Sequence, residues 1–292
     1  MISTLFPAAV LLACFATGAA AQGSVDPLRY ATDARYFGTP FGTVVLPPAG
    51  SWMVGPVDLT PTKHTVFTWA AALLTVGVLV PVSRLRARAA AGRGGSRVAA
   101  GALEMLAVAL RDRVVVPAIG PGGERYVPFV LTLFFFILFA NLLGLVPFGV
   151  AATANFSVTA ALALTVFVVC ELAGLRRNGV RGYLGTIFHR PAGMGPVGGW
   201  AMAVALAPLE LLGRVMRPFA LALRLMANML AGKILIYTVL GMVAAAGSYL
   251  LAPAPLLMAV AMTLLKVFVA VLQAYVFALL TSVFIGRVTR AH

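Results

Sequence analysis

The sequence has few charged residues and few of the groups that usually build a metal or disulfide site. Only 10% of its 292 residues are charged, with 8 acids against 22 lysines and arginines, and it has 3 histidines and 2 cysteines. Cys14 lies in an apolar leader and Cys170 in an apolar run, which argues against a structural disulfide. His189 has no second His, Cys or acid at ligand spacing. No G-x-x-x-x-G-K-[ST] motif is present, so we expect no nucleotide site and no cofactor.

What the chain has in abundance is apolar sequence. Hydrophobic residues make up 61% of it, and the mean hydropathy is +1.00. Several runs reach the roughly 20 residues that span a bilayer. The net charge of +14 is compatible with nucleic acid, but the basic residues lie in short stretches between apolar runs, as the positive-inside rule requires. The sequence therefore predicts an all-α polytopic membrane protein that does not bind nucleic acid.

Three regions follow one another along the chain. Residues 1–21 form an apolar leader that ends in three alanines, which is typical of a signal peptide; an uncleaved extra span is the alternative. Residues 22–62 are rich in proline and glycine and predict an extracytoplasmic segment. Residues 63–292 form the membrane domain.

The apolar runs of the membrane domain predict five spans, at about residues 65–82, 127–146, 155–172, 200–245 and 252–287. A basic loop after the first span, from Arg84 to Arg97, is expected in the cytoplasm, so the N-terminus lies outside and the C-terminus inside. Residues 103–116 predict an amphipathic helix at the membrane interface. Residues 174–199 predict a cytoplasmic loop. Glu171 lies just before this loop, and we expect it to form a surface ion pair with Arg176 or Arg177.

The last two helices are too long to cross a bilayer upright, because each residue adds about 1.5 Å to a helix. Steep tilting and bends at Pro208 and Pro218 would accommodate the first of them. That helix carries Arg224 deep in its apolar run, with no acid within four residues to form an i,i+4 pair. Either Arg224 extends to water, or it meets a carboxylate of another element or chain. We favour the second, because charges inside a span are costly and usually functional.

Polar residues gather on defined faces of the two helices. At about 100° per residue, Glu210, Arg217, Arg224 and Asn228 share one side of the first helix. Lys233 lies on the side opposite Arg224, and on the second helix a heptad separates Lys266 from Gln273. An ordinary helix–helix seam would explain the small residues beside this stripe but not an arginine in mid-helix.

Four segments resemble one known family. The run LRLMANMLAG at residues 223–232 is similar to the signature of the a subunit of F-type ATP synthase, the static half of its ion channel. Residues 129–147, 155–167 and 273–281 resemble earlier and later helices of that family, in the family's order. The resemblance covers about residues 60–288.

The resemblance implies a non-catalytic proton-conducting subunit of the bacterial inner membrane, with the two long helices tilted as a hairpin against a rotor ring. Arg224 is implied to attract the essential carboxylate of the rotor c-ring and to divide two half-channels, since a guanidinium keeps its proton. Asn228 and Gln273 match path residues near the arginine, and Glu210 matches an acid toward the cytoplasmic path. The further partners implied are the peripheral-stalk b subunits and the rest of the synthase.

The chain departs from the family on the outer path, where Lys233 and Lys266 stand in place of titratable acids or histidines. Either the lysines face each other, so that each makes the other's charge more costly, or they point apart and extend to water. Water, Asn141, Asn155 and Tyr237 are possible substitutes on that path. Asn141 equally fits a hydrogen bond to a neighbouring helix. Positive groups there argue against sodium as the transported ion.

Three other functions fit parts of the sequence. A sodium-translocating version of the same subunit is one alternative, and a secondary transporter is another, although the latter predicts internal repeats that we do not see. A structural subunit whose arginine merely pairs within an assembly would tolerate Arg224→Lys. A channel subunit would lose coupling on that change.

Overall fold

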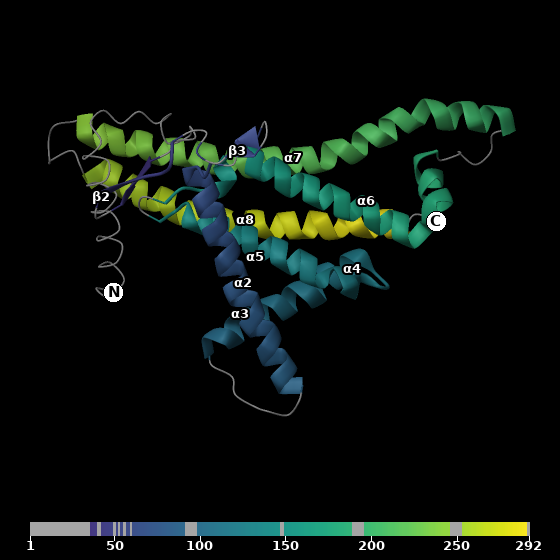
Figure 1. Cartoon of the computed structure of the whole chain (residues 1–292), viewed down its shortest axis with the longest axis horizontal. Coiled ribbons are helices and arrows are strands. Elements are labelled where there is room, and N and C mark those ends of the chain that lie inside the picture. Colours follow the sequence, from purple (N-terminus) through teal and green to yellow (C-terminus); the bar gives the residue numbers. More distant parts are fainter. Residues whose placement is uncertain are drawn as a thin grey trace. The chain divides into compact units, whose positions relative to one another are not determined.

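The structure is a computed structural model of the whole chain, traced in Figure 1. It describes residues 36–39, 42–48, 51, 53–54, 57–58, 60–90, 98–146, 149–188, 196–245 and 253–290. The predicted leader, His189 and the end of the basic loop at Arg93 and Arg97 lie outside these residues.

Five helices among the described residues are long and apolar enough to cross a membrane. This number confirms the polytopic all-α class. The candidate spans are Lys63–Arg84, Gly123–Leu143, Phe156–Val180, Gly198–Val239 and Pro253–Thr289.

Short strands occur in the N-terminal segment, for which the sequence predicted no particular structure. Strand β1 (Tyr36–Thr39) pairs antiparallel with β2 (Gly42–Val45), and Tyr36 lies opposite Val45. Strand β3 (Met53–Val54) pairs in the same way with β4 (Val57–Asp58). These two hairpins precede the first membrane helix.

The helical part of the chain runs from α2 to α8. Its elements are α2 (Lys63–Ala90), α3 (Val98–Leu110), the π-helical η2 (Arg111–Val115), α4 (Val116–Ile119), η3 (Gly123–Tyr126), α5 (Val127–Leu143), η4 (Ala152–Ala154), α6 (Phe156–Ile187), α7 (Pro196–Ala245) and α8 (Pro253–Arg290). Proline opens both α7 and α8, where its fixed φ suits the first turn and no N–H is needed. Helix α7 continues through Pro208 and Pro218 for 50 residues.

One predicted loop is largely helical. Helix α6 runs on to Ile187, through most of the stretch 174–199 that the sequence assigned to a loop. Gly179 interrupts it with φ 66° and ψ 175°, a conformation that is essentially restricted to glycine. Residues beyond Gly179 therefore form a separate helical tail. Basic residues misled the prediction, because Arg176 and Arg177 suit a helix as well as a loop.

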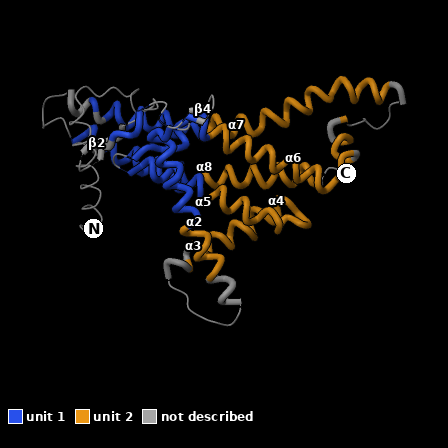
Figure 2. The backbone as a smooth tube through the Cα atoms, viewed as in Figure 1, with its two compact units in different colours: residues 1–76, 136–158, 225–273 blue, residues 77–135, 159–224, 274–292 orange. Residues whose placement is uncertain are grey.

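The chain forms two compact units, shown in blue and orange in Figure 2. Unit 1 comprises residues 1–76, 136–158 and 225–273, and unit 2 comprises residues 77–135, 159–224 and 274–292. Several helices, α7 and α8 among them, contribute one part to each unit.

Unit 1 is built around an antiparallel hairpin of α7 and α8. Met229 of α7 packs with Ala270 of α8, and Ile236 packs with Ala259, so the numbering rises along one helix as it falls along the other. The connector between α5 and α6 covers this hairpin through Ala151 and Ala154, which join the Met229 cluster. Small residues at these contacts allow close approach of the backbones.

In unit 2, side chains of α6 form hydrogen bonds to the C-terminal end of α8 and to the turn between α4 and η3. Asn178 Nδ2 donates to the carbonyl of Val288 at 3.1 Å, and Arg177 Nη1 donates to the carbonyl of Pro121 at 2.7 Å. Arg111 pairs with Glu124 at 2.9 Å. The amphipathic helix predicted for residues 103–116 is present as part of the continuous run from α3 to α4, with Ala107, Leu110 and Val114 buried.

Candidate functional site

Arg224 lies exposed on α7, at the end of the part of that helix that belongs to unit 2. The neighbouring Leu221 and Ala222 are buried, so the helix turns its apolar face inward and presents the guanidinium on the other side. No carboxylate of the described residues forms an ion pair with Arg224. Since an arginine keeps its charge under all physiological conditions, this cation remains available to an anion from outside the described chain.

Asn228 and Gln273 contact each other across the hairpin of unit 1. Asn228 Nδ2 donates to Gln273 Oε1 at 3.1 Å. Asn228 is exposed, whereas Gln273 is only 2% exposed. The buried Gln273 Nε2 has no hydrogen-bond partner among the described residues. The pair therefore offers polar atoms at the exposed side of α7 and retains one donor for a further group.

Lys233 and Lys266 are both buried in unit 1, at 7% and 9% exposure. Lys233 Nζ donates to the carbonyl of Gly149 in the α5–α6 connector at 2.9 Å. The side chain of Lys266 lies over Gly232, where an added Cβ would come within 2.4 Å of its Cε and 3.1 Å of its Nζ. The predicted alternative in which both lysines extend to water is therefore wrong, because both side chains end inside the unit.

A small cavity lies beside the two lysines. Tyr237 and Thr263 line it together with both lysines, and its volume is about 10 Å³. That is close to the smallest volume that holds one water, and the lining supplies the polar partners that a buried water needs. Both lysines, Tyr237 and Thr263 thus surround space for a single water.

A third lysine belongs to the same electrostatic environment. Lys63, at the start of α2, is 5% exposed, and its charge interacts with that of Lys233. The adjacent His64 is 1% exposed. Sequence reasoning missed both residues, because they stand at the edge of a span where charged and polar residues are ordinary. Only the fold brings Lys63 near Lys233.

The two asparagines proposed for the outer path have local partners. Asn141 is fully buried, and its Oδ1 accepts from Thr153 Oγ1 at 2.6 Å, which ties α5 to the connector. Asn141 Nδ2 has no partner among the described residues. Asn155 caps α6, since its Oδ1 accepts from the backbone N–H of Ser157 at 2.8 Å. The connector thus holds its shape through side chains that sequence reasoning considered for ion transport.

In unit 2, Glu210 belongs to a polar cluster between α6 and α7. Arg214 Nε lies 3.5 Å from Glu210 Oε1, and Arg214 Nη1 lies 3.6 Å from Glu171 Oε2. The Tyr183 hydroxyl donates to Glu171 Oε2. The expected surface pairing of Glu171 with Arg176 or Arg177 is therefore wrong: its ion-pair partner is the buried Arg214. Sequence reasoning missed Arg214 and Tyr183, because the break at Gly179 that returns Tyr183 to Glu171 has no sequence signal beyond the glycine itself.

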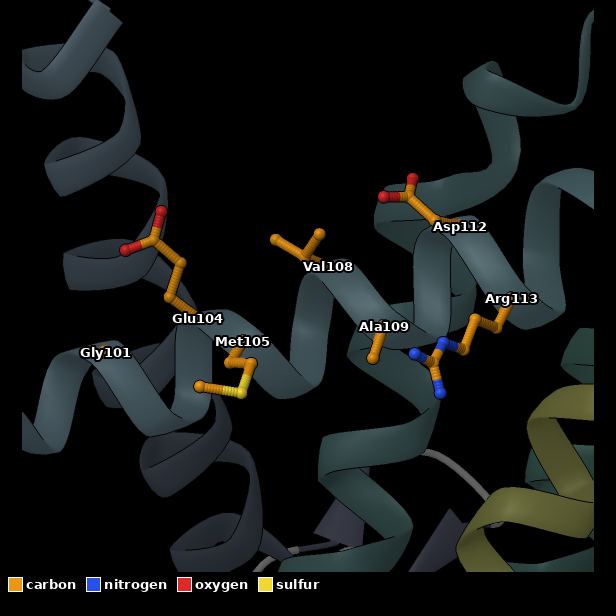
Figure 3. Close-up of a pocket in the computed structure, with 7 residues that line it drawn as sticks. All are labelled: Gly101, Glu104, Met105, Val108, Ala109, Asp112 and Arg113. Atoms are coloured by element: carbon orange, nitrogen blue, oxygen red, sulfur yellow. The ribbon is translucent and has the colours of Figure 1, made fainter.

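A separate open groove lies along α3 and η2 and has a volume of about 520 Å³ (Figure 3). Glu104, Val108 and Asp112 point to one side of it, and Met105, Ala109 and Arg113 point to the other, as their spacing of four residues requires. It contains none of the residues that the sequence assigned to ion transport. The residues that the sequence assigned to ion transport lie instead on α7, on α8 and at the α5–α6 connector.

The five apolar helices define a polytopic membrane protein with buried polar side chains, among them Asn141, Lys233, Lys266 and Arg214. Residues 65–286 match the family described as ATP synthase A chain. The chain is 45% identical to ATP synthase subunit a of Myxococcus xanthus over 235 residues, which are 80% of this chain and 74% of that protein. It is 37% identical to ATP synthase subunit a of Chloroherpeton thalassium over 263 residues, 90% of this chain and 76% of that protein. For the subunit of an Anaeromyxobacter strain the identity is 40%, over 84% of this chain and 58% of that protein.

This chain therefore belongs to the ATP synthase A chain family, and its role is that of a stator subunit in the membrane sector of the synthase. Because the chain belongs to this family, the other subunits of the synthase are its partners. The family assignment also argues against the alternative of a secondary transporter. The five spans agree with a multi-pass membrane protein.

Proposed function

We propose that this subunit conducts protons through two half-channels that do not meet and couples their passage to rotation of a ring through Arg224. The observation that carries the proposal is the exposed guanidinium on an apolar helix, which has no carboxylate partner among the described residues. A charge in a span is expensive unless it is paired. A carboxylate carried by a rotor subunit supplies that pair.

The arginine has two tasks in this proposal. Its charge attracts the ionised rotor carboxylate, which lowers the free energy of a bare anion in a low-dielectric region. It also separates the half-channels, because a guanidinium does not release its proton and so cannot pass one across. Lysine does not replace it in the second task, since a buried ammonium can lose its proton.

The outer half-channel runs, in this proposal, through the polar groups of unit 1. Lys233, Lys266 and Tyr237 surround space for one water, and Asn228 and Gln273 lie on the same hairpin. Asn141 and Asn155 shape the connector whose Gly149 carbonyl holds Lys233. Buried cations on this path disfavour entry of a sodium ion by charge repulsion, which supports the proton as the transported ion.

Glu210 serves the cytoplasmic half-channel. Its side chain is 37% exposed and is therefore accessible to water, although it pairs with Arg214. The N-terminus then lies outside the cell and the C-terminus in the cytoplasm, because the basic residues after α2 belong inside. The rotor ring faces the exposed side of α7 that carries Arg224, and the peripheral-stalk b subunits hold the chain static.

Ion identity and coupling are tested together in inverted vesicles that contain the assembled complex. ATP-driven acidification of the lumen is recorded with and without sodium, with and without uncoupler, for the wild type and for Arg224→Ala. The proposal predicts acidification that does not depend on sodium, collapses with uncoupler and is absent in Arg224→Ala. Transport that requires sodium and persists with uncoupler would show that sodium is the transported ion and would contradict the proposal.

A further inference from the structure

Arg214 is a buried cation in unit 2. Its side chain is 6% exposed, and arginine is rarely buried unless it is paired. It stands four residues after Glu210 on α7, in the order, acid before base, that favours an i,i+4 pair. The carboxylates around Arg214 therefore determine how its buried charge is compensated.

The guanidinium is shared by two carboxylates from two helices. Nε lies 3.5 Å from Glu210 Oε1 on α7, and Nη1 lies 3.6 Å from Glu171 Oε2 on α6. The Glu171 side chain is 19% exposed, whereas that of Glu210 is 37% exposed. Glu171 is thus the less exposed of the two carboxylates that balance the charge of Arg214, and Glu210 is the one more accessible to water.

Tyr183 fixes the arginine from a second direction. The guanidinium carbon lies 5.3 Å from the centre of the Tyr183 ring, within range of a cation–π contact. The hydroxyl donates to Glu171 Oε2, the same oxygen that faces Arg214. Burial, and then the hydrogen bond to Glu171 and its charge, raise the pKa of Tyr183, so the hydroxyl keeps its proton and remains a donor.

We propose that Arg214 is a positioning residue for Glu210: Glu171 and Tyr183 hold it from α6, and it fixes where the Glu210 carboxylate stands at the cytoplasmic path. This inference rests on the proposed function, because that function gives Glu210 its place on the path. Two anchors on α6 keep the guanidinium in place whichever way Glu210 turns. A cation that cannot lose its proton then directs the same carboxylate throughout each transport cycle.

Other charges of unit 2 lie nearby and must be separated from Arg214 in any test. The charge of Arg217 interacts with those of Glu210, Arg214 and Arg287. Arg217 is half-buried, so it is not a neutral control. Arg176 is exposed on α6 and takes part in none of these contacts among the described residues, which makes Arg176→Gln the matched control for loss of an arginine.

The test measures initial rates of ATP-driven acidification in vesicles with the assembled complex for Arg214→Gln, Glu210→Gln and the double variant. Subunit content is measured in each preparation. If Arg214 acts through Glu210, Arg214→Gln slows acidification by about threefold or more, and the double variant is no slower than Glu210→Gln alone. Arg214→Lys, which keeps the charge, recovers part of the rate, and Arg176→Gln matches the wild type. Effects that multiply in the double variant, or an unchanged rate in Arg214→Gln, would overturn the inference.

Tyr183→Phe keeps the test decisive where Arg214→Gln does not assemble. It leaves the ring over the guanidinium but removes the hydroxyl that holds Glu171. The inference predicts a slower rate that again disappears in the Glu210→Gln background, and additive effects contradict it. Arg224→Ala is run in parallel. Full pumping in Arg224→Ala refutes the proposed function, whereas loss of pumping there with additive Arg214 effects refutes this inference alone.

Discussion

At the scale of single residues, three polar side chains of the apolar helices of unit 1 have specific partners. Lys233 bonds the Gly149 carbonyl, Asn228 bonds Gln273, and Asn141 bonds Thr153. Burial of an amine or amide in an apolar region costs free energy unless such bonds are made. Each of these three side chains is therefore held in a defined position by a hydrogen bond to another segment of the chain.

The two lysines are the residues on which the outer path depends most. If they relay protons, Lys233→Gln combined with Lys266→Gln lowers the rate of ATP-driven pumping by about tenfold or more, because an amide does not take up and release protons. The rate is measured in inverted vesicles and divided by the amount of assembled complex. Lys233→Arg with Lys266→Gln serves as the companion variant that keeps a cation at the first position. Unchanged pumping in the double Gln variant eliminates a lysine relay.

The sequence singled out candidate residues for the ion path but did not predict their contacts. Arg224, Asn228 and Gln273 stood out by periodicity and by resemblance, since a mid-helix arginine is unusual in itself. Arg214, Tyr183 and Lys63 did not, because their significance comes from contacts between residues far apart in the chain. Glu171 and Tyr183, for example, meet only because α6 breaks at Gly179.

At the scale of elements, the hairpin of α7 and α8 has a glycine, Gly232, where the Lys266 side chain of α8 comes close to α7. Gly232 leaves room for Lys266, whose Cε would lie 2.4 Å from an added Cβ. The atom that must give way is the end of a flexible side chain, so the helices need not separate. The side chain of Lys266 moves instead.

Gly232→Ala therefore tests the position of Lys266 without removing it. We expect normal assembly and a pumping rate lowered by about threefold or more, because misplacement of a functional group by about 1 Å costs up to about 100-fold in rate. The control is Gly77→Ala on α2, where nothing lies within 4 Å of an added Cβ. Equal pumping in the two variants would show that the position of Lys266 does not matter.

The break in α6 is the second device at this scale. Gly179 has φ 66°, and nothing lies within 4 Å of an added Cβ, so an alanine there meets no neighbour and costs only backbone strain. The cost is about 1–3 kcal/mol.

Gly179→Ala is expected to loosen residues 180–187 and to release Tyr183 from Glu171. Hydrogen exchange of that tail in the purified complex should become faster, with slower pumping as a consequence. Gly185→Ala lies in the same tail, has no positive φ and also has open space around it, so it should leave exchange unchanged or slower. Equal protection in both variants would contradict the role of the break.

Helix positions were predictable from sequence because long apolar runs leave little choice in a membrane. All five predicted spans correspond to helices α2, α5, α6, α7 and α8. The ends were less predictable. Helix α6 continues past its charged residues to Ile187. The α5–α6 connector lies between two spans, as expected, but the sequence did not predict that Ala152 and Thr153 are buried. Both features arise from packing that periodicity does not encode.

At the scale of the whole molecule, the subunit is one part of a larger complex. Arg224 on α7 has no carboxylate partner among the described residues, and the chain belongs to the ATP synthase A chain family. One elementary charge that crosses 100 mV carries about 2.3 kcal/mol. Synthesis of ATP therefore needs several ions per nucleotide, which a multi-site rotor supplies and a lone channel does not.

The most direct test of the account is the number of protons pumped per ATP hydrolysed in vesicles that contain the assembled complex, compared for the wild type, Arg224→Lys and Arg224→Ala. Proton uptake and ATP hydrolysis are recorded in the same sample. The account predicts that both variants assemble and that both lose nearly all proton uptake per ATP. Retention of the wild-type ratio by both variants would contradict the central role of Arg224.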